Sequence, residues 1–159
     1  MKLYHGSNVE VKYPKIKEKL RALDFGAGFY LTSNRKQAER WAKTVTKRRN
    51  SGIATLNIYH IDEEEMSDIS VLQFETANAE WLDYVVANRK EQIFSNPYDV
   101  VIGPVANDST LPVIDDYMDG IYTKEEAVKR LMPQNLTDQY AFLTTRAIEI
   151  LKFEGSETL

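Results

Sequence analysis

The chain has 159 residues, of which 43% are hydrophobic and 28% charged, the size and balance of a single globular domain that can close its own core. Its formal net charge of −4 provides no overall basic field for nucleic acid or an anionic membrane, although local basic patches are compatible with that charge. Cysteine is absent, which excludes disulfides, a thiolate nucleophile and a sulfur-liganded zinc site.

The N-terminal part of the sequence predicts two short strands and a helix. Residues 2–5 (KLYH) and 29–32 (FYLT) are aromatic and aliphatic runs bounded by glycine, serine or asparagine, as strands often are. Residues 6–28 predict a loop with at most one helical turn, and loops of this length in compact domains tend to be functional. Asn34 opens a variant of the capping box and is followed by apolar residues at helical spacing, so we expect a helix from about 34 to 49.

The middle of the sequence predicts three strands and a second helix. Residues 54–61 and 69–74 have strand-like patterns and are separated by an acidic turn at 62–68. The helical spacing of apolar residues predicts a helix over 76–92. The apolar run at 99–104 predicts a buried strand that ends at a Gly-Pro pair.

The C-terminal part predicts one helix and two strands. Thr123 and Glu126 form a capping box for a short helix through Leu131, which a following proline ends. The β-branched and aromatic content of 139–144 and 147–153 favours strands, although the first residues of the second run are also compatible with a helix. Because strands and helices are mixed without a regular βαβ rhythm, we expect an α+β fold.

Several chemical motifs are incomplete, and the sequence lacks the features of secreted or membrane proteins. GAGFYL (26–31) begins like a dinucleotide-binding fingerprint, but it lacks the third glycine and leads into a strand. The acidic run at 62–65 lacks the ligand spacing of a calcium loop, and we expect a solvated turn there and an ordinary side-chain role for His60. No signal peptide and no apolar segment of ~20 residues is present, so we expect a cytoplasmic protein without a membrane partner.

Three separated segments place histidine, glycine, tyrosine and glutamine in a distinctive order. They are LYHGS (3–7) on the first predicted strand, GAGFYLTS (26–33) entering the second, and DQYAFLT (138–144) near the C-terminus. In order and context they resemble the signature segments of the ADP-ribosyltransferase superfamily, in its His-Tyr-Glu branch, and the chain looks closest to small bacterial members. The resemblance spans almost the whole chain and implies one domain, residues 1–159, with two small mostly antiparallel sheets and flanking helices around an NAD cleft.

The resemblance implies an NAD-dependent mono-ADP-ribosyltransferase, which breaks the nicotinamide–ribose bond and transfers ADP-ribose to an acceptor. Gly6 would let the nicotinamide carboxamide reach the backbone because it has no Cβ, and His5 would bind a ribose hydroxyl. Tyr30 and Trp41 would hold the nicotinamide ring between them. The implied NAD-binding residues are His5, Gly6, Ser7, Gly28, Tyr30, Thr32 and Trp41; the implied catalytic residues are His5, Tyr30 and Gln139, with no metal.

Gln139 stands where this branch usually has glutamate. A neutral amide can bind the 2′-hydroxyl of the ribose, but it cannot offer a negative charge to a cationic transition state or accept a proton. Three consequences stay open: transfer of a single ADP-ribose to an acceptor that brings its own activated nucleophile, which we favour; replacement of the glutamate by Asp138 or a carboxylate of the Asp108 loop; or NAD binding without turnover.

Each candidate residue also has a purely structural interpretation. His5 could bond a neighbouring backbone group, and Tyr30 could be an ordinary core tyrosine. Trp41 could belong to the buried face of its helix. Gly28 could be a turn glycine, and Thr32 could cap the helix that follows it.

A cluster of basic residues ends the first predicted helix: Lys43, Lys47, Arg48 and Arg49. Such residues complement the helix dipole, and a nucleic-acid acceptor would also use such a patch. The acceptor therefore stays open between protein and nucleic acid. By resemblance we also expect a toxin-like role with a cognate antitoxin-like partner, and the alternative function is a catalytically inactive NAD-binding or protein-interaction module.

Overall fold

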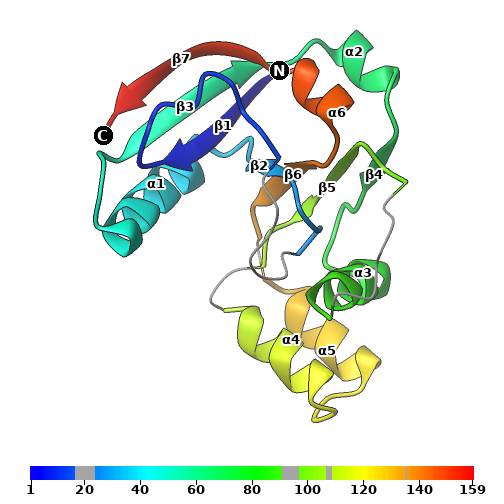
Figure 1. Ribbon diagram of the computed structural model, residues 1–159. Helices are drawn as coiled ribbons and strands as arrows, with labels where there is room; N and C mark the ends of the chain where they lie inside the picture. Colours follow the sequence, from blue (N-terminus) through cyan, green and yellow to red (C-terminus); the bar gives the residue numbers. More distant parts are fainter. Residues whose placement is uncertain (17–23, 91–96, 107–108, 135) are drawn as a thin grey trace.

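Two small β-sheets and six helices make up the described part of the chain (Figure 1). The computed structural model describes residues 1–16, 24–90, 97–106, 109–134 and 136–159. The first sheet has three antiparallel strands in the order β1 (Lys2–Ser7), β3 (Thr55–His60) and β7 (Lys152–Thr158). The second has four strands in the order β2 (Phe29–Leu31), β6 (Asp138–Phe142), β5 (Val100–Pro104) and β4 (Val71–Gln73), of which β4 and β5 are parallel.

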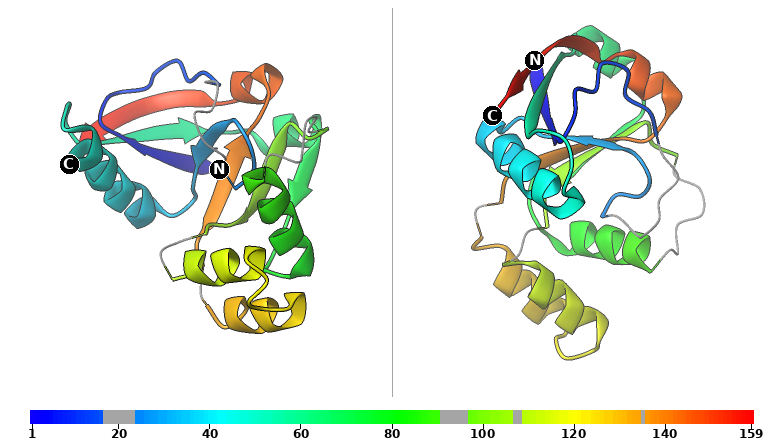
Figure 2. Two further views of the ribbon diagram at one scale, coloured as in Figure 1. Left: turned by 60° about the horizontal axis from the view of Figure 1, so that its bottom comes forward. Right: turned by 60° about the vertical axis from the view of Figure 1, so that its left-hand side comes forward.

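The helices lie outside the sheets. They are α1 (Arg35–Arg49), α2 (Glu63–Ser67), α3 (Ala79–Arg89), α4 (Leu111–Met118), α5 (Lys124–Leu131) and α6 (Thr145–Glu149). Helix α1 packs against the three-stranded sheet, whereas α3 lies beside the four-stranded sheet and α4 and α5 form a pair beyond it (Figure 2). The α+β class and the two small, mostly antiparallel sheets are therefore confirmed.

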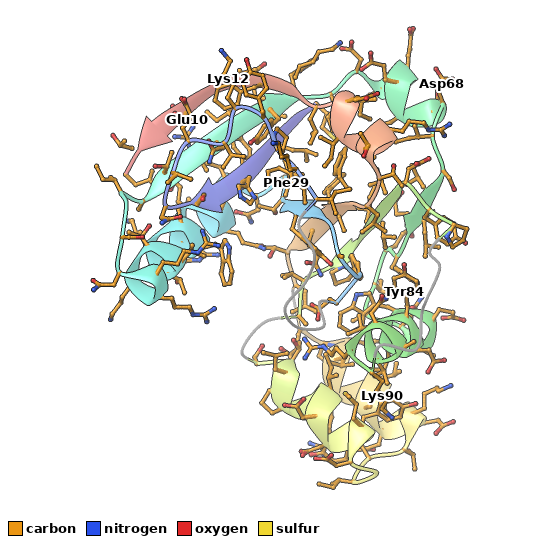
Figure 3. All side chains as sticks on the ribbon, viewed as in Figure 1. Glu10, Lys12, Phe29, Asp68, Tyr84 and Lys90 are labelled. Atoms are coloured by element: carbon orange, nitrogen blue, oxygen red, sulfur yellow. The ribbon has the colours of Figure 1, made fainter. Side chains whose placement is uncertain are left out.

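An apolar core joins the two sheets. Leu3 and Tyr59 are opposite each other on β1 and β3, and both side chains are fully buried against residues of the four-stranded sheet. Phe29 lies between the sheets (Figure 3) and meets Tyr59 edge to face, with ring centroids 5.8 Å apart. Burial of side chains of this size stabilises the fold by about 1.5–3 kcal/mol each. This core fixes the relative positions of β1 and β2.

A second core fills the other face of the four-stranded sheet. Trp81 and Leu82 of α3 are fully buried there with Val101 of β5 and Ala141 of β6. The indole Nε1 of Trp81 donates to the carbonyl oxygen of Pro104 at 3.0 Å, so the buried polar atom of this side chain is satisfied. Helices α4 and α5 complete this core, which is the larger of the two in aromatic and aliphatic side chains.

Two predicted helix starts are confirmed in detail. The side chain of Asn34 accepts a hydrogen bond from the backbone N–H of Gln37 at 3.0 Å, and Thr123 accepts one from Glu126 at 3.2 Å. Each bond satisfies one of the free donors at the first turn of a helix. Both helices therefore begin where local side-chain chemistry predicts.

Two predictions of secondary structure are wrong, and one helix was not predicted. The acidic turn at 62–68 contains the short helix α2, whose first turn is entirely acidic and so favourable for the helix dipole. The strand predicted at 147–153 is helix α6 followed by the start of β7, because Thr144 caps a helix by accepting from the N–H of Ala147 at 3.1 Å. Helix α4 was not predicted, since it has no side-chain cap and carries a proline in its first turn.

A membrane-crossing helix is not found in the ranges that the structure describes, because none of their helices is both long and apolar enough. The loop predicted at 6–28 lies partly outside those ranges, at residues 17–23.

Candidate functional site

In the described ranges, one isolated backbone bridge joins the two sheets, between β1 and the end of β2. Tyr4 and Thr32 exchange two backbone hydrogen bonds, each 2.9 Å long. Because β2 also pairs with β6, with Tyr30 opposite Ala141, the three segments with signature-like residues come from neighbouring strands. We call the place where β1 and β2 meet and part, formed by residues 4–6 and 30–32, the strand junction.

His5 is held at the strand junction by its ring. Its Nδ1 lies 2.7 Å from the carbonyl oxygen of Tyr30, and its ring centroid lies 4.3 Å from that of Phe29. A carbonyl oxygen only accepts hydrogen bonds, so Nδ1 is the donor, and the neutral ring then has its lone pair on Nε2. The structure thus selects one tautomer of His5.

Gly6 packs directly against α1. A Cβ at this position would lie 2.1 Å from the carbonyl oxygen of Ala38 and 2.7 Å from the backbone nitrogen of Ala42. The prediction ascribed the need for glycine to the approach of a ligand, but the space that a Cβ would fill is occupied by the helix. Gly6 therefore has a packing role that the sequence did not reveal.

The backbone of Gly6 still faces the strand junction. Backbone groups of residues two apart on a strand point to the same edge, so the N–H and C=O of Gly6 share the edge that Tyr4 uses to bond Thr32. If β1 and β2 continued to pair beyond the bridge between Tyr4 and Thr32, Gly6 would pair with Tyr30. Among the described residues no backbone bond joins them, and the Tyr30 carbonyl is instead bonded by His5. The parting of the two strands leaves this edge of β1 for another partner.

The Tyr30 side chain is directed into the helix-covered core rather than towards α1. Its hydroxyl donates to the carbonyl oxygen of Gly26 at 2.6 Å and accepts from the N–H of Phe25 at 3.1 Å. Burial raises the pKa of the Tyr30 phenol well above its usual range. Tyr30 thus holds the turn before β2, and its phenol stays neutral.

The two glycines of that turn also have structural roles. Gly26 adopts a φ of 94°, which favours glycine. A Cβ on Gly28 would lie 2.8 Å from the carbonyl oxygen of Phe142, so Gly28 permits the close approach of β2 to β6. Ser7, at the end of β1, is buried opposite Thr55.

Trp41 lies on α1 beside the strand junction. It follows Ala38 by one turn and precedes Ala42, the two residues whose backbones touch Gly6. The structural alternative placed Trp41 in the buried helix face, but its side chain is 44% exposed, and the Arg48 guanidinium lies 5.3 Å from its ring centroid. Among the described residues no ring contact links Trp41 to Tyr30, so the two rings lie in different environments.

Gln139 is buried on the same face of the four-stranded sheet as Tyr30. It follows from the register of β2 and β6 that the two residues are diagonal neighbours across the strands. Only 7% of Gln139 is exposed, and its Nε2 donates a long 3.5 Å hydrogen bond to the Pro104 carbonyl, which also accepts from Trp81. His5 lies on the other face, towards Phe29.

The neighbouring carboxylate, Asp138, is bound by the turn between β2 and α1. One of its oxygens accepts from the Thr32 hydroxyl at 3.0 Å and from the Ser33 N–H at 2.9 Å, and the other accepts from the Ser33 hydroxyl. Thr32 in turn accepts from the N–H of Asn34 at 3.0 Å. Asn34 is the residue that caps α1, so the capping interpretation of Thr32 is wrong, and Thr32 instead orders the turn that precedes the cap. Asp108 lies outside the described residues.

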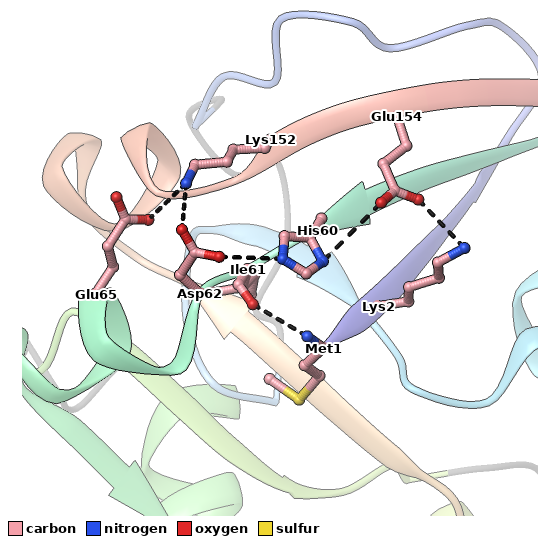
Figure 4. Close-up of polar contacts among 8 residues, drawn as sticks. All are labelled: Met1, Lys2, His60, Ile61, Asp62, Glu65, Lys152 and Glu154. Carbon is pink, nitrogen blue, oxygen red and sulfur yellow. Dashed lines mark hydrogen bonds and ion pairs between the residues drawn. The ribbon is translucent and has the colours of Figure 1, made fainter.

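The acidic run and His60 belong to a separate network of ion pairs at the opposite end of the three-stranded sheet (Figure 4). Asp62 bonds the Lys152 ammonium and the Nε2 of His60, the latter at 3.1 Å, and these contacts lower the pKa of its carboxyl. A surface hollow of about 550 Å³ lies beside this network, and another of about 260 Å³ includes Asp138. In the described ranges no three metal-binding side chains come together.

One contact near the junction was missed from the sequence. Arg48 is seven residues after Trp41, which places both on the same side of a helix after two turns. The seven-residue spacing could have indicated this contact, but Arg48 was interpreted only as part of a basic cluster that complements the helix dipole or binds a nucleic-acid acceptor.

Comparison with known proteins identifies a family for this chain. A family model described as "Protein of unknown function (DUF3990)" matches residues 1–153. Since the match covers most of the chain, the chain belongs to this family. No curated protein and no solved structure matches the chain.

Proposed function

We propose that this member of the DUF3990 family is an NAD-dependent mono-ADP-ribosyltransferase with an ADP-ribosyltransferase-like fold. The observation that carries the proposal is the strand junction. There the Nδ1 of His5 donates a hydrogen bond to the Tyr30 carbonyl oxygen, and the pairing between β1 and β2 ends. The helix that packs on this part of β1 carries an exposed tryptophan. These are the chain positions that carry the resemblance to the superfamily.

In this proposal the nicotinamide end of NAD binds at the edge of β1. The carboxamide of nicotinamide has one acceptor and one donor group, which match the N–H and C=O of Gly6. Trp41 lies on the turn of α1 that packs against Gly6, and in this proposal its exposed ring contacts the nicotinamide face, a contact that would contribute about 0.5–1.5 kcal/mol beyond burial. Tyr30 acts mainly as the support of the turn before β2.

His5 binds a ribose hydroxyl in this proposal. Its ring is held in place by the hydrogen bond from Nδ1 to the Tyr30 carbonyl oxygen and by the neighbouring Phe29 ring. His5→Ala should therefore weaken NAD binding measured by calorimetry.

The reaction breaks the C1′–N bond of the nicotinamide ribose. Nicotinamide leaves as a neutral molecule with the bonding electron pair, and an acceptor atom forms the new bond to C1′ and gives its proton to solvent. Gln139 is neutral and cannot take that proton. The acceptor must therefore be a nucleophile in its own right, and single transfer rather than chain elongation is expected.

The test is release of nicotinamide from NAD by purified protein, measured by chromatography, together with labelling of acceptors by isotopically labelled NAD. Trp41→Ala should reduce release about tenfold, whereas Tyr13→Ala, which removes an aromatic side chain that is 76% exposed, is the matched control and should not. The proposal is wrong if the wild-type protein releases no nicotinamide with any acceptor class and NAD does not raise its melting temperature.

A second candidate is NAD binding without turnover. It is favoured by the buried, neutral Gln139 and by the engagement of Asp138 with Thr32 and Ser33. Calorimetry distinguishes the two, because the second candidate requires NAD affinity with no nicotinamide release. Gln139→Glu sharpens the result: release that appears only in this variant would show that the site binds NAD and lacks only the carboxylate.

A further inference from the structure

Helix α1 carries a row of basic residues on its outer face. Lys36, Arg40, Lys43 and Lys47 follow the spacing i, i+4, i+7 and i+11, which places them on one side of a helix. All four are exposed. The opposite side of the helix, with Ala38, Ala42 and Val45, is buried against the three-stranded sheet. We call these four residues the basic stripe.

The basic stripe has no partner within the described chain. None of its residues forms an ion pair with a described residue, whereas the neighbouring Arg35 pairs with both Glu39 and Glu157. Like charges three and four residues apart destabilise a helix. Helix α1 contains seven basic residues and one acidic residue in a chain whose net charge is −4, so the positive charge is concentrated here.

The helix dipole does not explain the stripe. Basic residues are favourable in the last turn, which accounts for Lys47 and its neighbours Arg48 and Arg49. Lys36 lies in the first turn, where the dipole disfavours positive charge and where α1 has no acidic residue. The charge is therefore kept along the whole helix at a cost to helix stability, which indicates an anionic ligand outside the chain.

We propose that the basic stripe is a docking surface for single-stranded nucleic acid. From Lys36 to Lys47 the stripe is about 16 Å long, enough for several consecutive phosphates. It contains no apolar side chain, whereas the centre of a protein interface is apolar. Insertion into a membrane needs an exposed apolar face, and that face of α1 is buried.

A single strand is favoured over a duplex by what lies next to the stripe. Trp41 follows Arg40 on another face of α1, its side chain is 44% exposed, and the guanidinium of Arg48, a further cation of the same helix, lies 5.3 Å from its ring centroid. Single-strand binding surfaces combine cations for the backbone with an aromatic ring close by. An unpaired nucleotide on the stripe can also turn towards the junction, which a paired one cannot. The role of this nucleotide as the ADP-ribose acceptor rests on the proposed function, whereas the binding of a single strand to the basic stripe does not.

The test is fluorescence anisotropy with labelled 12-nucleotide strands of mixed-sequence DNA and RNA, without NAD. The wild-type protein should bind, with a slope of log K against log salt of about −2.8 for four phosphate contacts. Joint substitution of the stripe, Lys36→Gln, Arg40→Gln, Lys43→Gln and Lys47→Gln, should weaken binding about tenfold or more at low salt and flatten the slope. Circular dichroism should show an unchanged or higher helix content, because like charges are removed.

The matched control removes four exposed lysines elsewhere: Lys12, Lys15, Lys90 and Lys129, each to Gln. Lys12 lies over the three-stranded sheet and Lys90 beside α3, so the control charges come from other parts of the molecule than the stripe (Figure 3). This variant has the same net charge as the stripe variant and should bind like the wild type. Equal losses in the two variants would overturn the proposal, as would tighter binding of the duplex or of poly-glutamate than of the single strands. Because NAD is absent, failure here is distinct from failure of the NAD chemistry.

Discussion

The three-stranded sheet is covered by one helix, α1, whereas the four-stranded sheet is covered by α3, α4 and α5. On the four-stranded side, the polar groups near the strand junction are used by the fold: the Tyr30 hydroxyl bonds the 25–26 turn, Asp138 bonds Ser33, and Gln139 bonds Pro104. On the three-stranded side, the Trp41 ring and the basic stripe are exposed, whereas Gly6 is buried under α1 with its backbone N–H and C=O at the strand junction.

From this difference we expect the four-stranded side to stabilise the fold and the three-stranded side to bind ligands. Groups that are buried and bonded on the four-stranded side should affect stability when they are changed. Groups that are exposed on the three-stranded side should affect ligands more than stability. Gly6 belongs to both, because its missing Cβ makes room for α1 while its backbone faces the junction. The five predictions below test this separation.

Gly6→Ala should have the largest effect. Its Cβ would meet backbone atoms of α1 at 2.1 and 2.7 Å, and neither backbone can move without displacing a strand or a helix. We expect a loss of about 3 kcal/mol in the free energy of unfolding, measured by urea denaturation. Gly120→Ala is the control, since nothing lies within 4 Å of its Cβ position and only its positive φ costs stability. Equal losses in the two variants would contradict the packing role of Gly6.

Asp99→Asn should cost about 2 kcal/mol at neutral pH. The Asp99 carboxylate accepts from the Thr144 hydroxyl at 2.6 Å and from the Ser70 N–H at 2.9 Å, and it pairs with Arg146. Asp115→Asn, at an exposed position, should change stability by less than about 0.5 kcal/mol.

The same carboxylate predicts a pH dependence. The Thr144 hydroxyl, the Ser70 N–H and Arg146 lower the pKa of Asp99 in the folded state. Its contribution is therefore fully present above the unfolded carboxyl pKa of about 3.9 and is lost as the pH falls through the lowered folded value. Melting temperatures measured from pH 7 to pH 2 should fall less steeply in Asp99→Asn than in the wild type. If the melting temperatures of the two proteins fall equally between pH 7 and pH 2, Asp99 does not carry this dependence.

Tyr30→Phe should cost about 1–2 kcal/mol, because the buried Phe25 N–H and Gly26 carbonyl both lose their partner. The ring is retained, so NAD binding should change by much less than in Trp41→Ala. Thermal denaturation and calorimetry on the same sample measure the two effects. A large loss of NAD affinity with unchanged stability would place Tyr30 in the ligand site instead.

Trp41→Ala should have the smallest effect on stability, within about 0.5 kcal/mol, because the side chain is exposed. NAD affinity should fall about tenfold, and Trp41→Phe should restore most of it through its aromatic face. Destabilisation comparable to that of Tyr30→Phe would mean that Trp41 is part of the packing of α1, and the separation of the two sides would fail.

The sequence predicts well those elements that depend on neighbouring residues. Asn34 and Thr123 cap helices through side chains that bond the backbone three residues on, and such signals are local. The run at 147–153 was predicted wrongly because its apolar residues fit both a strand and a helix, and the cap that decides between them is Thr144, just outside the run.

The sequence predicted which residues form the candidate site, but it did not predict how their side chains are arranged in space. The structure pairs β2 with β6 and bridges β1 to Thr32, directly after β2, an arrangement that the order of the segments along the chain does not contain. The role of Gly6 depends on how closely α1 approaches, and the exposure of Trp41 depends on how α1 is rotated on the sheet. Both are tertiary facts that no local pattern contains.

The contrast between the two tryptophans has a practical consequence. Trp81 is fully buried and hydrogen-bonded, whereas Trp41 is in contact with solvent beside Arg48. A neutral quencher such as acrylamide will therefore extinguish the fluorescence of Trp41 and leave that of Trp81. The unmodified protein thus carries its own optical probe of α1, with which occupancy can be followed by titration in solution.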